Sequence, residues 1–225
     1  MDRLVERITD GQWGPGHLLP SETEIATELG VSSGTVRKAL EAMSAERIIS
    51  RRQGRGTFVS RLDPERVLFQ FFHFYPDDDH RDYPKSVIRN VKVGTANGEA
   101  ASKLQIQRGD GIVTIERLRL LSGQPCIFDI IVVPHKLFPN LEEHKYFSDN
   151  LYVYFAENFN IVISHAIERL KALNPPKKII KELGLNDTEP VLAIQRISST
   201  LNGDLVEWRT TYCQTKDFHY RVEIN

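Results

Sequence analysis

The chain has 225 residues, which fits one large domain or two of ordinary size. With 40% hydrophobic and 26% charged residues it has the composition of a packed globular protein, which excludes a disordered chain. Lys and Arg number 29 against 30 Asp and Glu, so the net charge of −1 predicts no attraction of the whole chain to nucleic acid or membrane. No apolar run approaches the roughly 20 residues of a membrane span, and residues 1–11 lack a signal peptide's apolar stretch, so we expect a cytosolic protein without membrane contact.

Cysteine and histidine usage argues against redox and metal chemistry. Cys126 and Cys213 lie far apart among strand-forming residues, which indicates two reduced core thiols. The segment 73–80 contains histidines and aspartates that could bind a metal, but its proline and successive aspartates favour a solvated loop near a domain junction. We therefore expect no metal, no other cofactor and no catalytic residues.

Charge is unevenly distributed along the first part of the chain. Five arginines follow Glu46 with no intervening acidic residue: Arg47, Arg51, Arg52, Arg55 and Arg61. The nearly neutral net charge of the whole chain therefore conceals a basic segment. The stretch 61–66 is polar and contains a proline, and the pattern beyond it changes from helical to strand-like. We therefore expect a first domain over 1–61, a linker and domain junction over 62–75, and a second domain over 76–225.

In chain order, helical spacing first appears at Leu4, Val5 and Ile8. A second helix is predicted to begin after Ser21, because Glu24 three residues later completes a capping box, and to end at Gly30. After a short turn, a third helix is predicted from about Thr35 to Ala45. Two short helices joined in this way form a candidate helix-turn-helix.

Residues 48–59 follow as two short strands around a glycine-containing, arginine-rich tip, which is typical of a β-hairpin wing. Arginine can pair with phosphate or enter a groove of DNA. The alternative is a solvated hairpin with a charged edge. Because the hairpin directly follows two helices, we favour DNA binding.

Four segments, Leu19-Pro20-Ser21-Glu22, Val31-Ser32, residues 35–40 and residues 51–59, closely resemble the winged helix-turn-helix of GntR-family bacterial transcription regulators. The remainder resembles the UTRA effector-binding domain of the HutC subfamily, which has a chorismate-lyase-like fold. The resemblance implies an α+β protein: a winged helix-turn-helix followed by a domain with a predominantly antiparallel sheet. It also implies these DNA-binding residues: Ser21, Ser32, Ser33, Thr35, Arg37, Lys38, Arg52, Gln53, Arg55 and Gly56. Ser33 stands where family members commonly have a DNA-contacting arginine, so the operator or the affinity differs.

The second domain alternates strand-like and helical segments. Strands are predicted at 87–95, 112–121, 127–133, 161–172, 191–200 and 206–213, with an edge strand at 218–224. Ser122-Gly123 and Asn202-Gly203 each separate two of these runs, as hairpin turns do. Short helices are predicted at 99–104, 151–159 and 175–183.

The strongest chemical feature of this domain is Arg117-Leu118-Arg119. Strand alternation places both guanidinium groups on one face, where they need an anion or carboxylates between them. Two hypotheses fit equally: pairing with Asp129, Glu168 and Glu207, or binding of an anionic ligand. The UTRA resemblance favours the ligand and implies these effector contacts: Arg117, Arg119, Asp129, Asn150, Tyr152, Glu207 and Tyr212. Asn150 stands where UTRA domains often have a serine. Residues 212–215 stand where UTRA domains usually have Tyr-Arg-x-Asp. We interpret Arg196, on another predicted strand, as a structural ion-pair partner.

The resemblance therefore predicts a ligand-responsive transcription regulator, most often a repressor, and not an enzyme. Its partners would be a double-stranded, palindromic DNA operator, a second copy of the chain in a homodimer, and a small anionic effector such as a sugar phosphate, an amino acid or an organic acid. Two alternatives stay open: a chorismate-lyase-like enzyme acting on a small carboxylate, and a DNA-binding protein whose second domain only dimerises.

Overall fold

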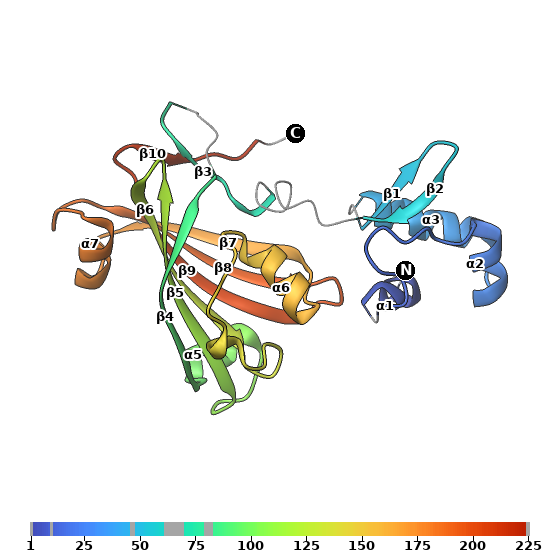
Figure 1. Ribbon diagram of the computed structural model, residues 1–225, viewed down its shortest axis with the longest axis horizontal. Coiled ribbons are helices and arrows are strands. Elements are labelled where there is room, and N and C mark those ends of the chain that lie inside the picture. Colours follow the sequence, from blue (N-terminus) through green and yellow to red (C-terminus); the bar gives the residue numbers. More distant parts are fainter. Residues whose placement is uncertain (1, 10, 46–47, 61–69, 79–82, 224–225) are drawn as a thin grey trace. The chain divides into compact units, whose positions relative to one another are not determined.

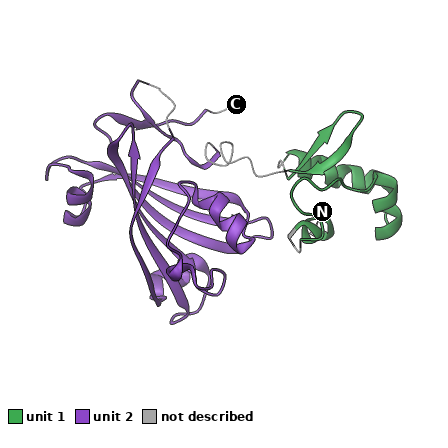
Figure 2. Cartoon of the chain, in the orientation of Figure 1, with its two compact units in different colours: residues 1–66 green, residues 67–225 purple. Residues whose placement is uncertain are grey.

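The computed structural model describes residues 2–9, 11–45, 48–60, 70–78 and 83–223. The chain divides into two compact units, Met1–Arg66 and Val67–Asn225 (Figure 2). The boundary expected at 61–66 lies outside the described residues.

The described residues of the first unit form three helices and a hairpin (Figure 1). Its elements are α1 (Asp2–Thr9), α2 (Glu22–Leu29), α3 (Ser33–Ala45), β1 (Ile49–Arg52) and β2 (Gly56–Val59). The strands pair antiparallel, with Arg52 opposite Gly56 at the tip. One face of each helix packs inward, and the buried side chains include Leu4, Ile25, Val36, Leu40 and Met43. The predicted winged helix-turn-helix is confirmed, and α3 begins two residues earlier than expected.

The second unit is built on a six-stranded sheet in the order β4-β5-β6-β9-β8-β7, and all its strand pairs are antiparallel. Its strands are β4 (Lys85–Thr95), β5 (Gly111–Leu121), β6 (Gln124–Pro134), β7 (Ile163–Leu173), β8 (Val191–Thr200) and β9 (Leu205–Gln214). Among the described residues of this unit, the helices are α5 (Gly98–Leu104), α6 (Leu151–Phe159) and α7 (Lys177–Leu183), and η1 (Leu141–Glu143) is a 3-10 turn. Every strand predicted for this sheet is confirmed within three residues at each end.

The two faces of the sheet are covered differently. On one face, α6 packs Leu151 and Phe155 onto Val113 and Ile131. On the other face, two separate clusters form, one with α5 around Leu104 and one with α7 around Ile179 and Leu183. The helices on the two faces are visible in Figure 1. Because side chains alternate along each strand, odd-numbered positions from Ile127 to Val133 of β6 and from Glu207 to Cys213 of β9 face the α6 side, and the even-numbered positions between them face α5 and α7.

A small two-stranded sheet completes the second unit. β3 (Phe74–Pro76) pairs antiparallel with β10 (Phe218–Tyr220). The prediction of a solvated loop at 73–80 is wrong for the β3 residues, because Phe74 is buried and stacks on Phe218. The predicted edge strand at 218–224 ends at Tyr220, and residue 224 lies outside the described residues.

The two cysteines lie in the hydrophobic cluster that also contains Phe74 and Phe218. Cys126 and Cys213 are both free thiols and both buried, which confirms the prediction of reduced core cysteines. Burial raises the pKa of Cys126 to about 12 and that of Cys213 well above its usual value. Both therefore stay protonated as small apolar core residues. Across the described parts of the chain, none of the helices has the length and apolarity that crossing a membrane requires.

Candidate functional site

The helix-turn-helix is fixed by a cap at the start of each of its helices. Ser21 Oγ accepts the N–H of Glu24 at 3.2 Å, and the Glu24 carboxylate accepts the N–H of Ser21 at 2.7 Å. At α3, Ser32 Oγ accepts the N–H of Thr35 at 3.1 Å. These bonds satisfy backbone donors that a helix start leaves free, and each cap stabilises its helix by about 1 kcal/mol. Ser21 and Ser32 therefore have a definite structural role, whatever else they contact.

The outer face of α3 presents a cluster of polar and basic side chains. Ser33, Thr35, Arg37 and Lys38 are all exposed. Arg37 is held in place by Glu22, whose carboxylate accepts from Nε of Arg37 at 2.9 Å. The same carboxylate lies 3.5 Å from Nη2 of Arg51 on β1. Glu22 thus links the start of α2 to α3 and to the wing.

The wing carries its arginines at an exposed tip. Arg52, Gln53, Arg55 and Gly56 are exposed, and the Arg55 N–H donates to the Arg52 carbonyl at 2.9 Å to close the turn. The guanidinium of Arg52 lies 5.1 Å from the centre of the Phe58 ring. All ten residues predicted to bind DNA therefore lie on the surface of the first unit, in its two capped helix starts, α3 and the wing tip.

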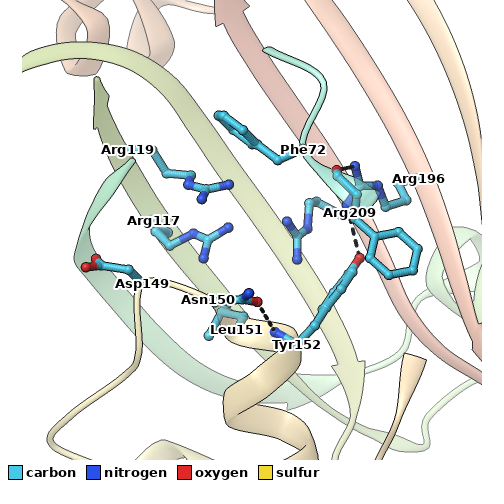
Figure 3. A pocket seen from close by; sticks show the side chains of 10 residues that line it. Phe72, Arg117, Arg119, Asp149, Asn150, Leu151, Tyr152, Arg196 and Arg209 are labelled. Atoms are coloured by element: carbon cyan, nitrogen blue, oxygen red, sulfur yellow. Dashed lines mark hydrogen bonds between the residues drawn. The ribbon is translucent and has the colours of Figure 1, made fainter. Parts of the chain in front are cut away.

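In the second unit, the predicted arginine pair lies on the α6 side of β5. Arg117 and Arg119 both line a cavity at the start of α6, as strand alternation predicted. Figure 3 shows their guanidinium groups pointing toward one another and toward that of Arg209, which comes from β9. Both β5 arginines are buried, with 1% and 5% of their surface exposed. Three cations in a buried space require anions nearby.

Arg117 has such an anion. Its Nε and Nη2 donate to the Asp129 carboxylate at 3.0 and 2.7 Å, and Thr211 donates to the other oxygen of Asp129 at 2.6 Å. Burial opposes ionisation of Asp129, but Arg117, Arg209 and Arg119 hold the pKa of this carboxyl well below its usual range. Asp129 is therefore a permanent carboxylate, and the hypothesis that Arg117 pairs within the sheet is correct for this residue.

Arg209 also has a carboxylate partner. Its Nη2 donates to Glu207 at 2.6 Å, and Glu207 accepts further bonds from Tyr152 at 2.8 Å and from Ser198 at 3.3 Å. Burial opposes the charged form of Arg209, yet Glu207 raises its pKa above the ordinary value. This buried network joins α6 to β8 and β9.

Arg196, on β8, is bound at both ends of its guanidinium. Its Nε donates to Glu168 at 2.7 Å, its Nη1 donates to the Tyr152 hydroxyl at 3.1 Å, and its Nη2 donates to the backbone carbonyl of Phe71. The expected ion-pair role is therefore confirmed. The residue also lines the cavity, which sequence analysis did not predict.

Arg119 differs from the other three arginines. Among the described residues, no carboxylate pairs with it, and its Nε has no hydrogen-bond partner. Its guanidinium lies 4.5 Å from the centre of the Phe72 ring, which supplies a cation–π contact. Burial, together with the charge of Arg117, lowers the pKa of Arg119 to about 9, so at neutral pH it is a buried, unpaired cation.

Asn150 and Tyr152 lie where the resemblance placed them, at the cavity wall. Asn150 caps α6, because its Oδ1 accepts the N–H groups of Tyr152 and Val153 at 3.2 and 3.4 Å (Figure 3). The Tyr152 ring packs edge-on against Phe71, with ring centres 5.0 Å apart. Asp129, Glu207 and the two arginines join them, so six of the seven predicted effector residues lie together.

Tyr212 is the seventh, and its predicted position at the cavity is not what the structure shows. It is an even-numbered residue of β9 and packs on the opposite face of the sheet, in the cluster of Phe128 and Ile179 beneath α7. Strand alternation separates it from Thr211 and Cys213, which face the cavity side.

Besides Arg196, sequence analysis missed five cavity residues: Phe71, Phe72, Asp149, Leu151 and Arg209. Arg209 could have been found, because it lies two positions from Glu207 on one strand and must face the same side. The phenylalanines gave no such signal, since they lie within the expected linker, directly before a strand that was not predicted. A second cavity shares Phe72 and Arg119 with the first and reaches His73 and Tyr220.

Metal binding finds no support in the described residues, where no cluster of three or more ligand-type side chains occurs. Asp79 and His80, at the end of the segment that contains the histidines and aspartates, lie outside the described residues.

The architecture is that of a DNA-binding regulator: a winged helix-turn-helix with a basic tip, followed by a domain with a buried, arginine-lined cavity. Residues 80–219 match the UTRA domain family, and residues 1–59 match the family described as bacterial regulatory proteins, gntR family. The chain therefore belongs to the gntR family of bacterial transcription regulators and carries a UTRA domain; its class is that of regulators, not enzymes.

Relatives of the chain are similar over nearly their whole length. The chain is 31% identical to the HTH-type transcriptional repressor NagR of Bacillus subtilis, over 92% of this chain and 85% of the relative. It is 28% identical to the mannosyl-D-glycerate transport/metabolism system repressor of Escherichia coli, over 98% and 92% of the two chains. The histidine utilization repressor of Pseudomonas putida is 24% identical over 86% and 77%, in keeping with the HutC resemblance.

Solved structures agree on the fold. The ligand-binding domain of a GntR-family transcriptional regulator from Bordetella bronchiseptica superposes with a TM-score of 0.63 at 28% identity, covering 69% of this chain and 97% of that one. PhnF from Mycobacterium smegmatis, at 21% identity, matches with a TM-score of 0.60 over 99% and 98% of the two chains. The second of these shows the fold alone.

Proposed function

We propose that this protein is a ligand-responsive transcriptional repressor whose affinity for its operator changes when a small anionic metabolite binds the cavity of the second unit. The observation that carries the proposal is Arg119, a buried cation without a carboxylate partner among the described residues, facing a cavity. A buried unpaired charge is costly, and an anionic ligand removes that cost. Two relatives are named as repressors, which supports repression over activation.

On the DNA side, α3 enters the major groove and the wing tip contacts the backbone and minor groove. Arg37, Lys38, Arg52 and Arg55 supply positive charge on exposed surfaces, as phosphate contacts require. Ser33 and Thr35, in the first turn of α3, are placed to reach base edges or phosphates. Because Ser33 makes no bidentate contact to guanine, base readout shifts to its neighbours.

The functional form is a homodimer on a palindromic operator. One winged unit contacts only a short half-site, and two-fold symmetry doubles the contacts. The effector favours one arrangement of the paired units over another. A coupling of about 1–3 kcal/mol changes operator affinity about 5–150-fold, which is enough for a genetic switch.

The proposal is tested by identifying what the cavity holds. Native mass spectrometry of the protein purified without added ligand identifies a retained compound, and fluorescence anisotropy with an operator fragment then measures DNA affinity with and without it. Arg119→Gln should abolish the response while leaving operator affinity unchanged. Arg89→Gln is the matched control, because Arg89 pairs with Glu182 at 3.0 Å outside the cavity.

The results separate the alternatives. If Arg119→Gln and the double variant Arg117→Gln/Arg119→Gln fold and respond like the wild type, the cavity is not the effector site, the effector proposal is wrong, and a second unit that only dimerises is favoured. If the retained compound is converted during incubation, the protein has an enzymatic activity, and a pure repressor role is excluded.

A further inference from the structure

The buried charges around the cavity form a nearly complete set of pairs. Among the described residues, the two cavities are lined by four arginines, Arg117, Arg119, Arg196 and Arg209, and by two carboxylates, Asp129 and Glu168. A third carboxylate, Glu207, lies behind the wall, where it accepts from Tyr152 and Arg209. Each carboxylate belongs to one arginine. The Nη2-to-oxygen distances are 2.7 Å for Arg117, 2.5 Å for Arg196 and 2.6 Å for Arg209. Only Arg119 is left over, so the set carries one surplus positive charge.

Groups at the margin do not change this balance. Asp149 lines the mouth of the cavity, but its side chain is 46% exposed and lies 3.5 Å from Lys85 Nζ. His73 lies at the second cavity, where burial lowers its pKa, so the ring is neutral at pH 7 and above. Two N–H groups at the start of α6 are already bound by Asn150. The surplus therefore remains close to a single unit charge.

Unpartnered donors show where the compensating charge belongs. Arg117 Nη1, Arg119 Nε and Arg209 Nε are buried without a hydrogen-bond acceptor. Figure 3 shows these three guanidinium groups converging on one space beside Asn150. A carboxylate has two oxygens with about four acceptor sites, so it can accept from the guanidinium groups that line this space.

We infer that the anionic group recognised by this cavity is a carboxylate with a single negative charge, and not a phosphate monoester with two. A single charge balances Arg119 and leaves the buried set neutral. A second charge would be buried without a partner, which the low-dielectric surroundings oppose. This inference rests on the proposed effector role of the cavity and narrows the ligand to organic acids and amino acids.

The sharpest probes are two anions that share a methyl group: acetate and methyl phosphate. The wild type and Arg119→Gln are compared by thermal unfolding with each anion at matched ionic strength and pH 8, where a phosphate monoester, with its second pKa near 6, carries two charges. Stabilisation by an anion that occurs in the wild type and not in Arg119→Gln is assigned to this cavity, whereas stabilisation that occurs in both proteins is a general salt effect. We expect this component to give an apparent Kd roughly tenfold lower for acetate than for methyl phosphate.

Two further arms test the role of charge. Lowering the pH to about 6, where methyl phosphate is partly a monoanion, should tighten its binding and leave acetate unchanged. Glu168→Gln raises the surplus from one charge to two and should move the preference toward methyl phosphate. Glu116→Gln is its control, because Glu116 belongs to the same sheet but pairs with Lys178 at 2.5 Å outside the cavity.

The outcomes distinguish this inference from the proposed function. If methyl phosphate at pH 8 stabilises the wild type as much as acetate or more, through Arg119, the carboxylate inference is overturned while the anionic effector site stands. If neither anion stabilises the wild type beyond Arg119→Gln, both are overturned. A preference for acetate that Glu168→Gln reverses supports both.

Discussion

The guanidinium carbon of Arg119 lies 4.5 Å from the centre of the Phe72 ring, and this ring is the partner that the structure gives the unpaired cation. Two positions away on β5, Arg117 has Asp129 at 2.7 Å. The two arginines that looked equivalent in the sequence therefore differ in kind: one is part of the sheet's internal ion pairs, and the other is available to a ligand.

The contact between Arg119 and Phe72 is tested by a double-mutant cycle. We expect Phe72→Leu, Arg119→Gln and the double variant to give a coupling free energy of about 0.5–2 kcal/mol, because a desolvated cation–π contact is worth about that much. Urea unfolding of the four proteins measures it. Phe218→Leu in place of Phe72→Leu is the control, since its ring stacks on Phe74, and its cycle with Arg119→Gln should give no coupling.

The buried charge of Arg119 also predicts how stability depends on pH. Its pKa falls from 12.5 in the unfolded chain to about 9 in the folded one. The cost of burying the charge is therefore fully present below pH 9 and is relieved as the pH rises from about 9 toward 12.5. Without ligand, Arg119→Gln should be more stable than the wild type at pH 7, by roughly 1–3 kcal/mol.

This advantage should shrink as the pH rises past about 9, since the wild type then loses its penalty and the glutamine has none to lose. Urea unfolding of both proteins at pH 7 and at pH 9.5–10 gives the difference. An advantage that stays constant over this range, or a glutamine variant less stable at pH 7, contradicts the assignment of an unpaired charge.

Local signals predicted most of this fold because each belongs to a short stretch of chain. The capping box at Ser21 and the Ser122-Gly123 turn between β5 and β6 are decided by near neighbours in the sequence. β3 was missed because its pairing with β10 joins segments separated by about 140 residues and no turn marks it. Tyr212 was placed on the wrong face because it was assigned by resemblance, whereas alternation from Glu207 would have put it opposite.

The charge state of the cavity could not be predicted either. Strand alternation established that Arg117 and Arg119 share a face, yet which of them pairs with Asp129 depends on the register of β5 against β6, where Arg117 lies opposite Asp129. Only that register leaves Arg119 unpaired.

The wing predicts a salt-dependent contribution to DNA binding. Replacing Arg52 and Arg55 by alanine should weaken binding to operator and unrelated DNA alike and lower the slope of log K against log salt by about 2, because each phosphate contact contributes about 0.9. Anisotropy titrations across a salt series measure this slope. Arg89→Ala, in the second unit, is the control and should leave it unchanged; an unaltered slope in the wing variant would mean that these arginines do not contact phosphate.

Glu22 restrains two of the basic residues beside the helix-turn-helix. Its carboxylate binds Arg37 at 2.9 Å and lies 3.5 Å from Arg51. Glu22→Gln removes a negative charge from the surface that faces DNA and frees both cations, so we expect affinity for any duplex to rise several-fold at low salt. Glu28→Gln removes the same charge from the pair with Arg7 and should have a smaller effect on DNA binding. Equal effects from the two variants would show that Glu22 acts through net charge alone.

Gly56 fixes the geometry at the base of the wing tip. Its φ is +109°, which L side chains rarely adopt, and a Cβ there would lie 2.6 Å from Cδ1 of Leu18. Leu18 can move aside, but the backbone conformation cannot be relieved without reshaping the turn, so Gly56→Ala should destabilise the first unit by about 1–2 kcal/mol and weaken DNA binding.

Gly34 is the matched control for this substitution. It lies in the first turn of α3, and a Cβ there meets only Ser32 Oγ, at 3.8 Å. Gly34→Ala should therefore stabilise the unit by about 0.5–1 kcal/mol, since alanine is the better helix former. Chemical unfolding of both variants compares the two directions. If Gly56→Ala leaves the free energy of unfolding unchanged, the turn tolerates another backbone conformation. Gly56 is then not the residue that holds Arg52 and Arg55 in position for DNA binding.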